Sequence, residues 1–178
     1  MPRTIVLKFI TPVLAVFSGA VVLIAVIGAL LPRRHLATRT AVYRQTPAEL
    51  FAVIANFAAM PSWRSGLSGV EILPPNGGRA SFREAAGRRP ITYVVLENRP
   101  PEKLVLQIAD EKLPFGGTWT YEVSPEAGGA RLRITEDGEI RNALFRFLSR
   151  FVFGYTATMD TYLRDLGRKF GETVAPAT

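Results

Sequence analysis

The stretch KLVLQIADEKLPFGGTWTYEVSPEAGGARLRITEDG, residues 103–138, contains three short runs of apolar and β-branched side chains. In the middle run, Trp119, Tyr121 and Val123 alternate with polar residues, which is the two-residue period of a strand with one buried face. The segments between the runs, residues 113–117 and 126–129, each contain a Gly-Gly pair that suits a tight connection. The pattern predicts consecutive antiparallel strands.

The same pattern extends toward the N-terminus, where proline- and glycine-rich connections separate further short runs. A first strand is expected at residues 38–44. It is followed by a helix that begins with Thr46 as N-cap, Pro47 at the first helical position and Glu49 closing a capping box. The six later strands are expected at residues 69–73, 80–85, 91–97, 103–110, 118–124 and 130–138.

The C-terminal part has the period of a helix. Apolar residues recur at spacings of three and four between about Asn142 and Gly171, which predicts one long helix with a single apolar stripe. Gly154 is expected to loosen this helix midway. Residues 173–178 are expected to form a flexible tail. The stripe consists of Leu144, Leu148, Phe151, Tyr155, Met159, Tyr162, Leu166 and Phe170.

The N-terminal segment, by contrast, is apolar on every side. After a tail of residues 1–8, the 24 residues from Phe9 to Pro32 carry no charged side chain. As a helix they would extend roughly 36 Å, enough to cross a hydrocarbon core of about 30 Å. A transmembrane helix is therefore predicted at residues 9–32. A cleaved signal peptide is the alternative, although the run exceeds the roughly 7–15 apolar residues of such a peptide.

The net charge of +7 is concentrated beside this apolar segment. Residues 1–40 carry five basic and no acidic side chains, whereas the remainder carries 17 basic and 15 acidic ones. Anionic lipid headgroups are the natural partners of such a cluster, and the balanced remainder argues against nucleic-acid binding. Four arginines follow the apolar segment, at positions 33, 34, 39 and 44, and they favour a cytoplasmic location for the globular part.

Reactive residues are scarce. The chain has no cysteine, which excludes disulfides, thiolate catalysis and cysteine-based metal sites. Its one histidine, His35, is expected on the surface beside the membrane, so a histidine metal site or catalytic triad is not predicted. Phosphate-binding and dinucleotide-binding glycine motifs are also missing, and no cofactor is predicted.

Several segments together resemble the polyketide cyclase/dehydrase branch of the START-like superfamily, often called SRPBCC, including members with an N-terminal membrane helix. The resemblance covers residues 36–172 and implies an α+β helix-grip fold, in which a curved antiparallel sheet wraps a long C-terminal helix. The segments that carry it are TPAELF at 46–51, MPSWR at 60–64, LPFGGTWTY at 113–121, ITEDGE at 134–139 and FRFLSRF at 145–151.

This resemblance also implies an apolar cavity between sheet and helix. The candidate ligand-binding residues are Trp63, Phe82, Tyr93, Trp119, Tyr121, Phe151, Tyr155 and Met159. The alternative for each is that it packs a filled core. The acid–base candidates are Glu84, Glu136 and Asp160, because strand alternation places Glu84 with Phe82 and Glu136 with Ile134. The alternative for the carboxylates is pairing with arginines or exposure at strand ends.

Three functions are compatible with these features. The first is a membrane-anchored protein that binds a hydrophobic small molecule such as a lipid, quinone or isoprenoid. The second is a cyclase or dehydratase that acts on a polyketide-like substrate. The third is a structural or regulatory protein that contacts an unidentified partner through residues 145–153.

Overall fold

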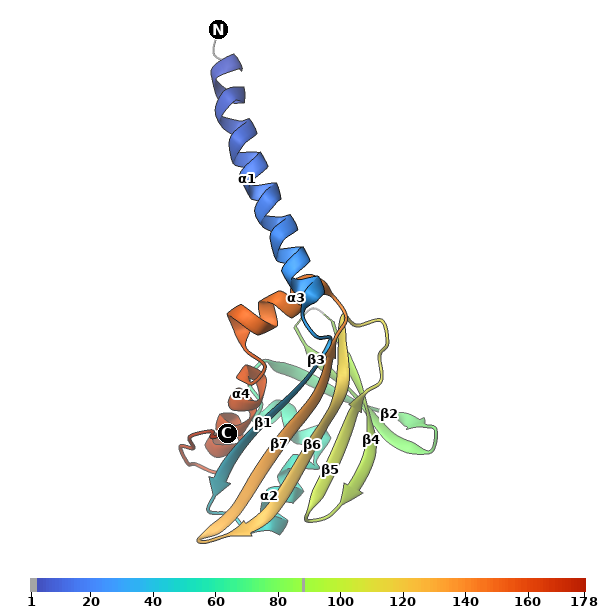
Figure 1. Ribbon diagram of the computed structural model, residues 1–178. Helices are drawn as coiled ribbons and strands as arrows, with labels where there is room; N and C mark the ends of the chain where they lie inside the picture. The colour runs from blue at the N-terminus through green and yellow to red at the C-terminus, as the bar shows by residue number, and fades with distance from the viewer. Residues whose placement is uncertain (1–2, 88) are drawn as a thin grey trace.

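The computed structural model describes residues 3–87 and 89–178, with side chains from Phe17 onward. Helix α1 (Arg3–Leu30) projects away from a domain in which a sheet and several helices are packed together (Figure 1). In the described part of the chain, no helix is at once long and apolar enough to span a membrane. The side chains of residues 9–16, where the predicted span begins, lie outside the described set, and that span stays a prediction.

The sheet has seven antiparallel strands in the order β1-β7-β6-β5-β4-β3-β2. Strands two to seven are thus a meander, as predicted, and the first strand pairs with the last. Inward residues alternate with outward ones as expected, because Phe82, Tyr121 and Ile134 are buried on one face. The strands are β1 (Arg34–Tyr43), β2 (Leu67–Asn76), β3 (Arg79–Ala86), β4 (Ile91–Arg99), β5 (Lys103–Ile108), β6 (Phe115–Glu126) and β7 (Gly129–Ile140).

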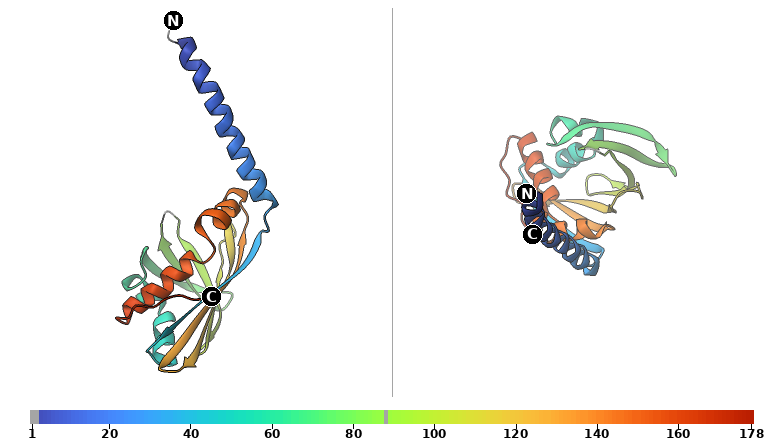
Figure 2. Two further views of the ribbon diagram at one scale, coloured as in Figure 1. Left: turned by 60° about the vertical axis from the view of Figure 1, so that its left-hand side comes forward. Right: turned by 90° about the horizontal axis from the view of Figure 1, so that it is seen from above.

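Helices cover the concave face of this sheet. Helix α2 (Pro47–Ile54), the 3-10 helix η1 (Phe57–Ser62) and helix α4 (Ala157–Lys169) lie on this side, and the sheet curves around them (Figure 2). The predicted capping box is present at the start of α2, where Glu49 Oε2 accepts from Thr46 N at 2.9 Å. The layers therefore follow the helix-grip arrangement that the resemblance implied.

The single long C-terminal helix was predicted wrongly. The segment instead forms α3 (Ala143–Leu148), the π-helix η2 (Ser149–Phe153) and α4, separated at Gly154. Gly154 has φ of +74°, a left-handed conformation that a side chain disfavours. The break lets α4 pack on the sheet while α3 lies against the base of α1 (Figure 1).

The C-terminal tail, predicted to be flexible, is paired with the edge of the sheet. Ala177 and Thr40 exchange two backbone hydrogen bonds of 2.8 Å, and Arg39 Nη1 donates to Thr178 Oγ1 at 2.9 Å. Strand β1 is thereby bonded on both sides at Thr40.

Candidate functional site

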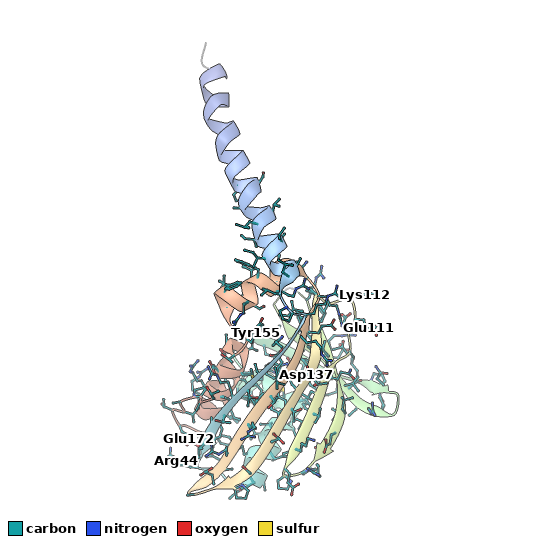
Figure 3. The ribbon with its side chains drawn as sticks, viewed as in Figure 1. Arg44, Glu111, Lys112, Asp137, Tyr155 and Glu172 are labelled. Carbon is teal, nitrogen blue, oxygen red and sulfur yellow. The ribbon has the colours of Figure 1, made fainter. Side chains whose placement is uncertain are left out.

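A pocket of about 270 Å³ opens between the concave face of the sheet and the segment that links α3 to α4. The sheet contributes Tyr93 and Trp119, whose side chains point inward by strand alternation. The helical segment contributes Phe145 and Tyr155, and Figure 3 shows Tyr155 beneath α3, at the end of the domain nearest α1. The walls are thus mainly apolar and aromatic.

One end of the pocket is polar. His35 Nε2 lies 3.8 Å from Glu136 Oε1, and the two side chains are only 11% and 18% exposed. The His35 ring also stacks on Tyr155, with ring centroids 4.2 Å apart. His35 faces Gly138 across the strand pair, and a Cβ at that position would lie 2.5 Å from His35 Nε2. The glycine therefore makes room for the imidazole ring.

The placement of His35 corrects the sequence prediction of a surface residue beside a membrane. Strand β1 begins at Arg34, four residues before the predicted start, and this extension brings His35 into the sheet. It then shares the inward face with Ala37, Ala41 and Tyr43. Alternation from Ala41 and Tyr43 back to Arg34 would have placed His35 on the inward face, but the predicted strand began only at residue 38.

A buried polar cluster lies deeper under the helices. Arg64, on the connection after η1, forms an ion pair with Glu84 on β3, and Glu84 is buried. The guanidinium carbon of Arg64 also lies 5.1 Å from the centre of the Tyr162 ring, within range of a cation–π contact. Burial acts to lower the pKa of Arg64, but the Glu84 carboxylate, its hydrogen bond to Arg64 and the nearby Tyr121 and Tyr162 together outweigh burial, and the pKa is raised. Arg64 is therefore a permanent cation inside the domain.

Three buried tyrosines interact electrostatically with this ion pair. Burial raises the pKa values of Tyr93, Tyr121 and Tyr162, because a phenolate would be poorly solvated there. All three are thus neutral groups that can donate a hydrogen bond at physiological pH. The Tyr162 hydroxyl and Trp63 Nε1 are buried and have no hydrogen-bond partner among the described residues.

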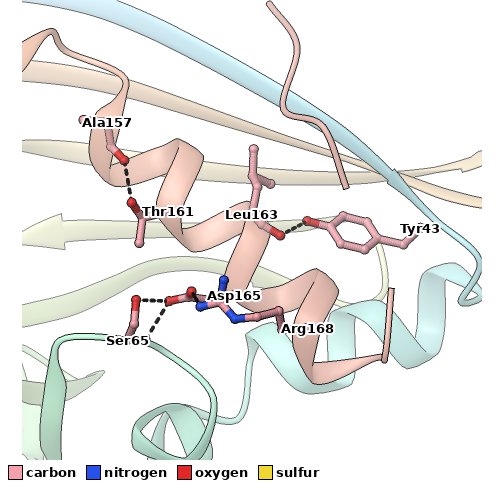
Figure 4. A network of polar contacts seen from close by, with 7 residues as sticks. All are labelled: Tyr43, Ser65, Ala157, Thr161, Leu163, Asp165 and Arg168. Carbon is pink, nitrogen blue, oxygen red and sulfur yellow. Dashed lines mark hydrogen bonds and ion pairs between the residues drawn. The ribbon is translucent and has the colours of Figure 1, made fainter. Parts of the chain in front are cut away.

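A second hollow of about 270 Å³ lies at the start of α4 and is lined by Arg64, Tyr162 and Asp165. Thr158 lines both hollows, so the two are adjacent. Asp165 fixes this wall, because its Oδ2 accepts from Ser65 N at 2.6 Å and from Ser65 Oγ at 2.7 Å, and its Oδ1 pairs with Arg168 (Figure 4).

The eight predicted ligand-binding residues fall into three groups. Tyr93, Trp119 and Tyr155 line the pocket. Trp63, Phe82, Tyr121 and Met159 are buried in the core cluster beside it. Phe151 lies elsewhere, because it is 59% exposed and packs on Phe147 on the outside of the π-helix.

The three predicted carboxylates also separate. Glu136 lines the pocket. Glu84 is buried with Arg64, and Asp160 pairs with Arg39 at 2.9 Å, which is the arginine pairing considered as the alternative. Glu136 is therefore the one of these three that faces the pocket. Among the described residues, there is no cluster of three or more His, Cys, Asp or Glu side chains suited to a metal ion.

A larger hollow of about 660 Å³ lies on the opposite face of the sheet, but its lining is polar. Four of its charged groups already pair with one another, Arg34 with Asp137 at 3.3 Å and Arg141 with Glu139 at 3.5 Å. The pocket with His35 and Glu136 is the better ligand site, because apolar walls with a few converging polar groups are typical of small-molecule sites.

Residues 34–171 match a protein family described as polyketide cyclase / dehydrase and lipid transport. The chain belongs to this family. The match includes every residue of the pocket and of the buried polar cluster, and it supports the superfamily that the sequence resembles. Among the curated proteins, none matches the chain.

Solved structures share the fold at low sequence identity. A conserved protein from Geobacillus kaustophilus has a TM-score of 0.66 at 10% identity, with 81% of this chain and 100% of that chain covered. A START superfamily protein from Mycobacterium smegmatis has a TM-score of 0.60 at 15% identity, with 76% and 96% covered.

The di-domain ARO/CYC protein StfQ from the steffimycin biosynthetic pathway has a TM-score of 0.62 at 14% identity. The likeness covers 75% of this chain and 50% of that chain, so the present protein spans about half the length of StfQ. At these identities the likeness shows a common fold.

Proposed function

We propose that the protein binds a hydrophobic small molecule, such as a lipid, a quinone or an isoprenoid, in the pocket between the sheet and the α3–α4 segment. The observation that carries the proposal is the pocket itself, which has aromatic walls at Tyr93, Trp119 and Tyr155 and a polar end at His35 and Glu136. Hydrophobic ligands gain free energy from leaving water for such walls, and the polar end orients them.

The size of the pocket limits the ligand. A volume of about 270 Å³ is slightly below the roughly 300–1,000 Å³ typical of small-molecule sites. A ligand with one polar group and a short or branched apolar body fits inside, and a longer chain would extend past Phe145 toward the opening. Binding of the polar group by His35 and Glu136 favours a hydroxyl or carbonyl over a bare hydrocarbon, since both side chains can take part in hydrogen bonds.

The proposal includes membrane attachment through α1, with the domain on the cytoplasmic side. Helix α1 is distant from the rest of the chain over most of its length, so its described apolar side chains are exposed; they include Phe17, Leu23 and Leu30. Attachment would hold the pocket at the membrane surface, where apolar ligands are concentrated, and would raise their effective concentration.

Native mass spectrometry and lipid extraction of the detergent-purified full chain test the binding function. A bound apolar molecule should be recovered with the wild-type protein and lost from Trp119→Ala, whose side chain lines the pocket. Ile72→Ala is the matched control, because Ile72 is an exposed apolar residue on β2 that does not line the pocket. Consistently empty wild-type protein, with no affinity for a panel of lipids, would contradict the proposal.

The His35–Glu136 pair favours a second candidate, a dehydratase acting on a polyketide-like β-hydroxy ketone. Glu136 would remove the proton next to the carbonyl, and protonated His35 would give a proton to the departing hydroxyl, which yields an unsaturated ketone and water. Dehydration of a β-hydroxy ketone by the wild-type protein, lost in both Glu136→Gln and His35→Gln, would support the enzyme over the binding protein. Binding of the β-hydroxy ketone without dehydration would support the binding protein.

A further inference from the structure

The segment formed by α3 and η2 carries an exposed apolar patch. Its members are between 44% and 61% exposed, and they lie within ten consecutive residues: Leu144, Phe145, Phe151, Val152 and Phe153. Isolated apolar residues on a surface need no explanation, but a contiguous group of this kind marks a contact surface. We refer to these five residues as the α3–η2 patch.

The patch lies where α1 meets the domain. Helix α3 packs on the last turns of α1, and a Cβ at Gly28 would collide with the carbonyl oxygen of Ala143. Arg146, which is only 5% exposed, donates from Nε to the Gly28 carbonyl at 2.7 Å. The same end of α1 exposes Val26 and Leu30, so apolar side chains are exposed on both helices at this junction.

The charged residues within α3 and η2 have one sign. They are Arg146 and Arg150, with no acidic residue, and Arg150 is exposed. Arg33, directly after α1, is also exposed, whereas the neighbouring Arg34 is paired with Asp137 at 3.3 Å. An apolar patch with exposed arginines at its border matches a surface that is apolar inside and anionic at its boundary.

We propose that the α3–η2 patch lies in the interfacial layer of a lipid bilayer, with Phe151, Val152 and Phe153 among the acyl chains and Arg150 at the phosphates. This inference rests on the proposed function and adds a route for the ligand. The same segment lines the pocket through Phe145 and Ser149, and Tyr155, just after the segment, lines it too. Contact of this segment with the bilayer therefore places the pocket opening against the membrane, and an apolar ligand enters without crossing water.

A bilayer fits the patch better than a second copy of the chain. A symmetric contact between two copies would bring the patch of each onto the patch of the other. The two exposed Arg150 side chains would then be close together, with no acidic residue on α3 or η2 to neutralise them. Anionic lipids supply the missing negative charge.

The absence of cysteine from the chain allows a direct test. Val152→Cys places a single thiol in the patch, and an environment-sensitive fluorophore attached there reports whether the position is in lipid. Ser124→Cys is the matched control, because Ser124 is exposed near the β6–β7 connection, at the end of the sheet far from α1 (Figure 1). Both full-length variants are reconstituted into vesicles of phosphatidylcholine and phosphatidylglycerol.

The fluorophore at position 152 should shift to shorter wavelength, be quenched by a nitroxide on the lipid acyl chain and be protected from aqueous iodide. The fluorophore at position 124 should show the reverse. Phe153→Cys should repeat the result for position 152, which guards against a local folding defect. Equal iodide quenching at positions 152 and 124 would overturn the inference, as would protection at 152 that depends on protein concentration and not on lipid. Ligand recovery by mass spectrometry is measured separately, so failure of the patch and failure of the binding function are distinguishable.

Discussion

Replacement of Arg146 by Met is expected to separate α1 from the domain. Arg146 is buried, and its guanidinium donates to the carbonyls of Gly28 at 2.7 Å, Arg141 at 3.0 Å and Ile140 at 3.2 Å. Gly28 belongs to the last turns of α1, whose carbonyls carry the partial negative charge of the helix C-terminus. One side chain thus joins three segments: the end of α1, the end of β7 and α3.

The size of the effect follows from these contacts. A hydrogen bond from a charged donor contributes about 1.5–3 kcal/mol, and removing the donor leaves buried carbonyls without a partner. Three such bonds are not additive because they share one guanidinium, so the junction should lose about 3–5 kcal/mol. Met retains much of the aliphatic stem, which limits the loss from packing. Arg146→Lys should fall between wild type and Arg146→Met, because an ammonium keeps the charge but cannot present the fork of donors.

Backbone hydrogen exchange measures the junction locally. In Arg146→Met, the amide of Leu31, which bonds to the Ile27 carbonyl at 3.2 Å, should exchange on the order of a hundredfold faster or more. Arg150→Met is the control, since Arg150 is exposed and should leave this exchange unchanged. Equal exchange in Arg146→Met, Arg150→Met and wild type would refute the assignment of Arg146 as the residue that fixes α1 to α3.

Three further predictions concern the pocket and the core. Gly138→Ala should displace the His35 ring, because the added Cβ would lie 2.5 Å from Nε2 and 3.1 Å from Nδ1. The affinity for a fatty alcohol should then fall about tenfold or more, while the affinity for the parent alkane should be unchanged. Equal losses of affinity for the two ligands, measured by titration calorimetry, would contradict a polar end at His35. Tyr43→Phe should lower the free energy of unfolding by about 1 kcal/mol, because the Tyr43 hydroxyl donates to the Leu163 carbonyl at 2.9 Å. Tyr162→Phe should raise the free energy of unfolding or leave it unchanged, because the Tyr162 hydroxyl has no partner among the described residues. Denaturant titration of both variants checks which of the two is more stable. The free energy of unfolding should fall as the pH rises above about 10, because burial raises the pKa of Tyr162 in the folded state. Tyr162 therefore ionises first in the unfolded chain, which then binds fewer protons than the folded one. A free energy of unfolding that stays constant across this pH range would be the contrary result.

The sheet was predictable because its signals are local. Alternation at Trp119, Tyr121 and Val123, with glycine pairs at the connections, determines both strand type and the inward face. The start of α2 was equally accessible, since the capping box at Thr46 and Glu49 acts over three residues. The break at Gly154 was only half predicted, because periodicity continues across a glycine whether or not its φ becomes positive.

The polar part of the site was less accessible from sequence. Glu136 was found by alternation, but His35 was assigned to the wrong environment because the first strand begins four residues earlier than its propensities indicate. Arg64 belongs to the MPSWR segment that carries the family resemblance, yet its ion pair with Glu84 joins residues 20 positions apart on different elements. Such a pairing depends on how η1 packs against β3, which no local pattern records.

Photo-crosslinking tests the central claim most directly. A diazirine-bearing isoprenoid alcohol is irradiated with the detergent-solubilised full chain, and the labelled peptides are mapped by mass spectrometry. We expect labelling of the segments that carry Trp119 and Tyr155, and we expect excess unlabelled alcohol to remove it. Labelling restricted to α1, or labelling around Trp119 that excess alcohol leaves unchanged, would contradict a ligand pocket between the sheet and the α3–α4 segment.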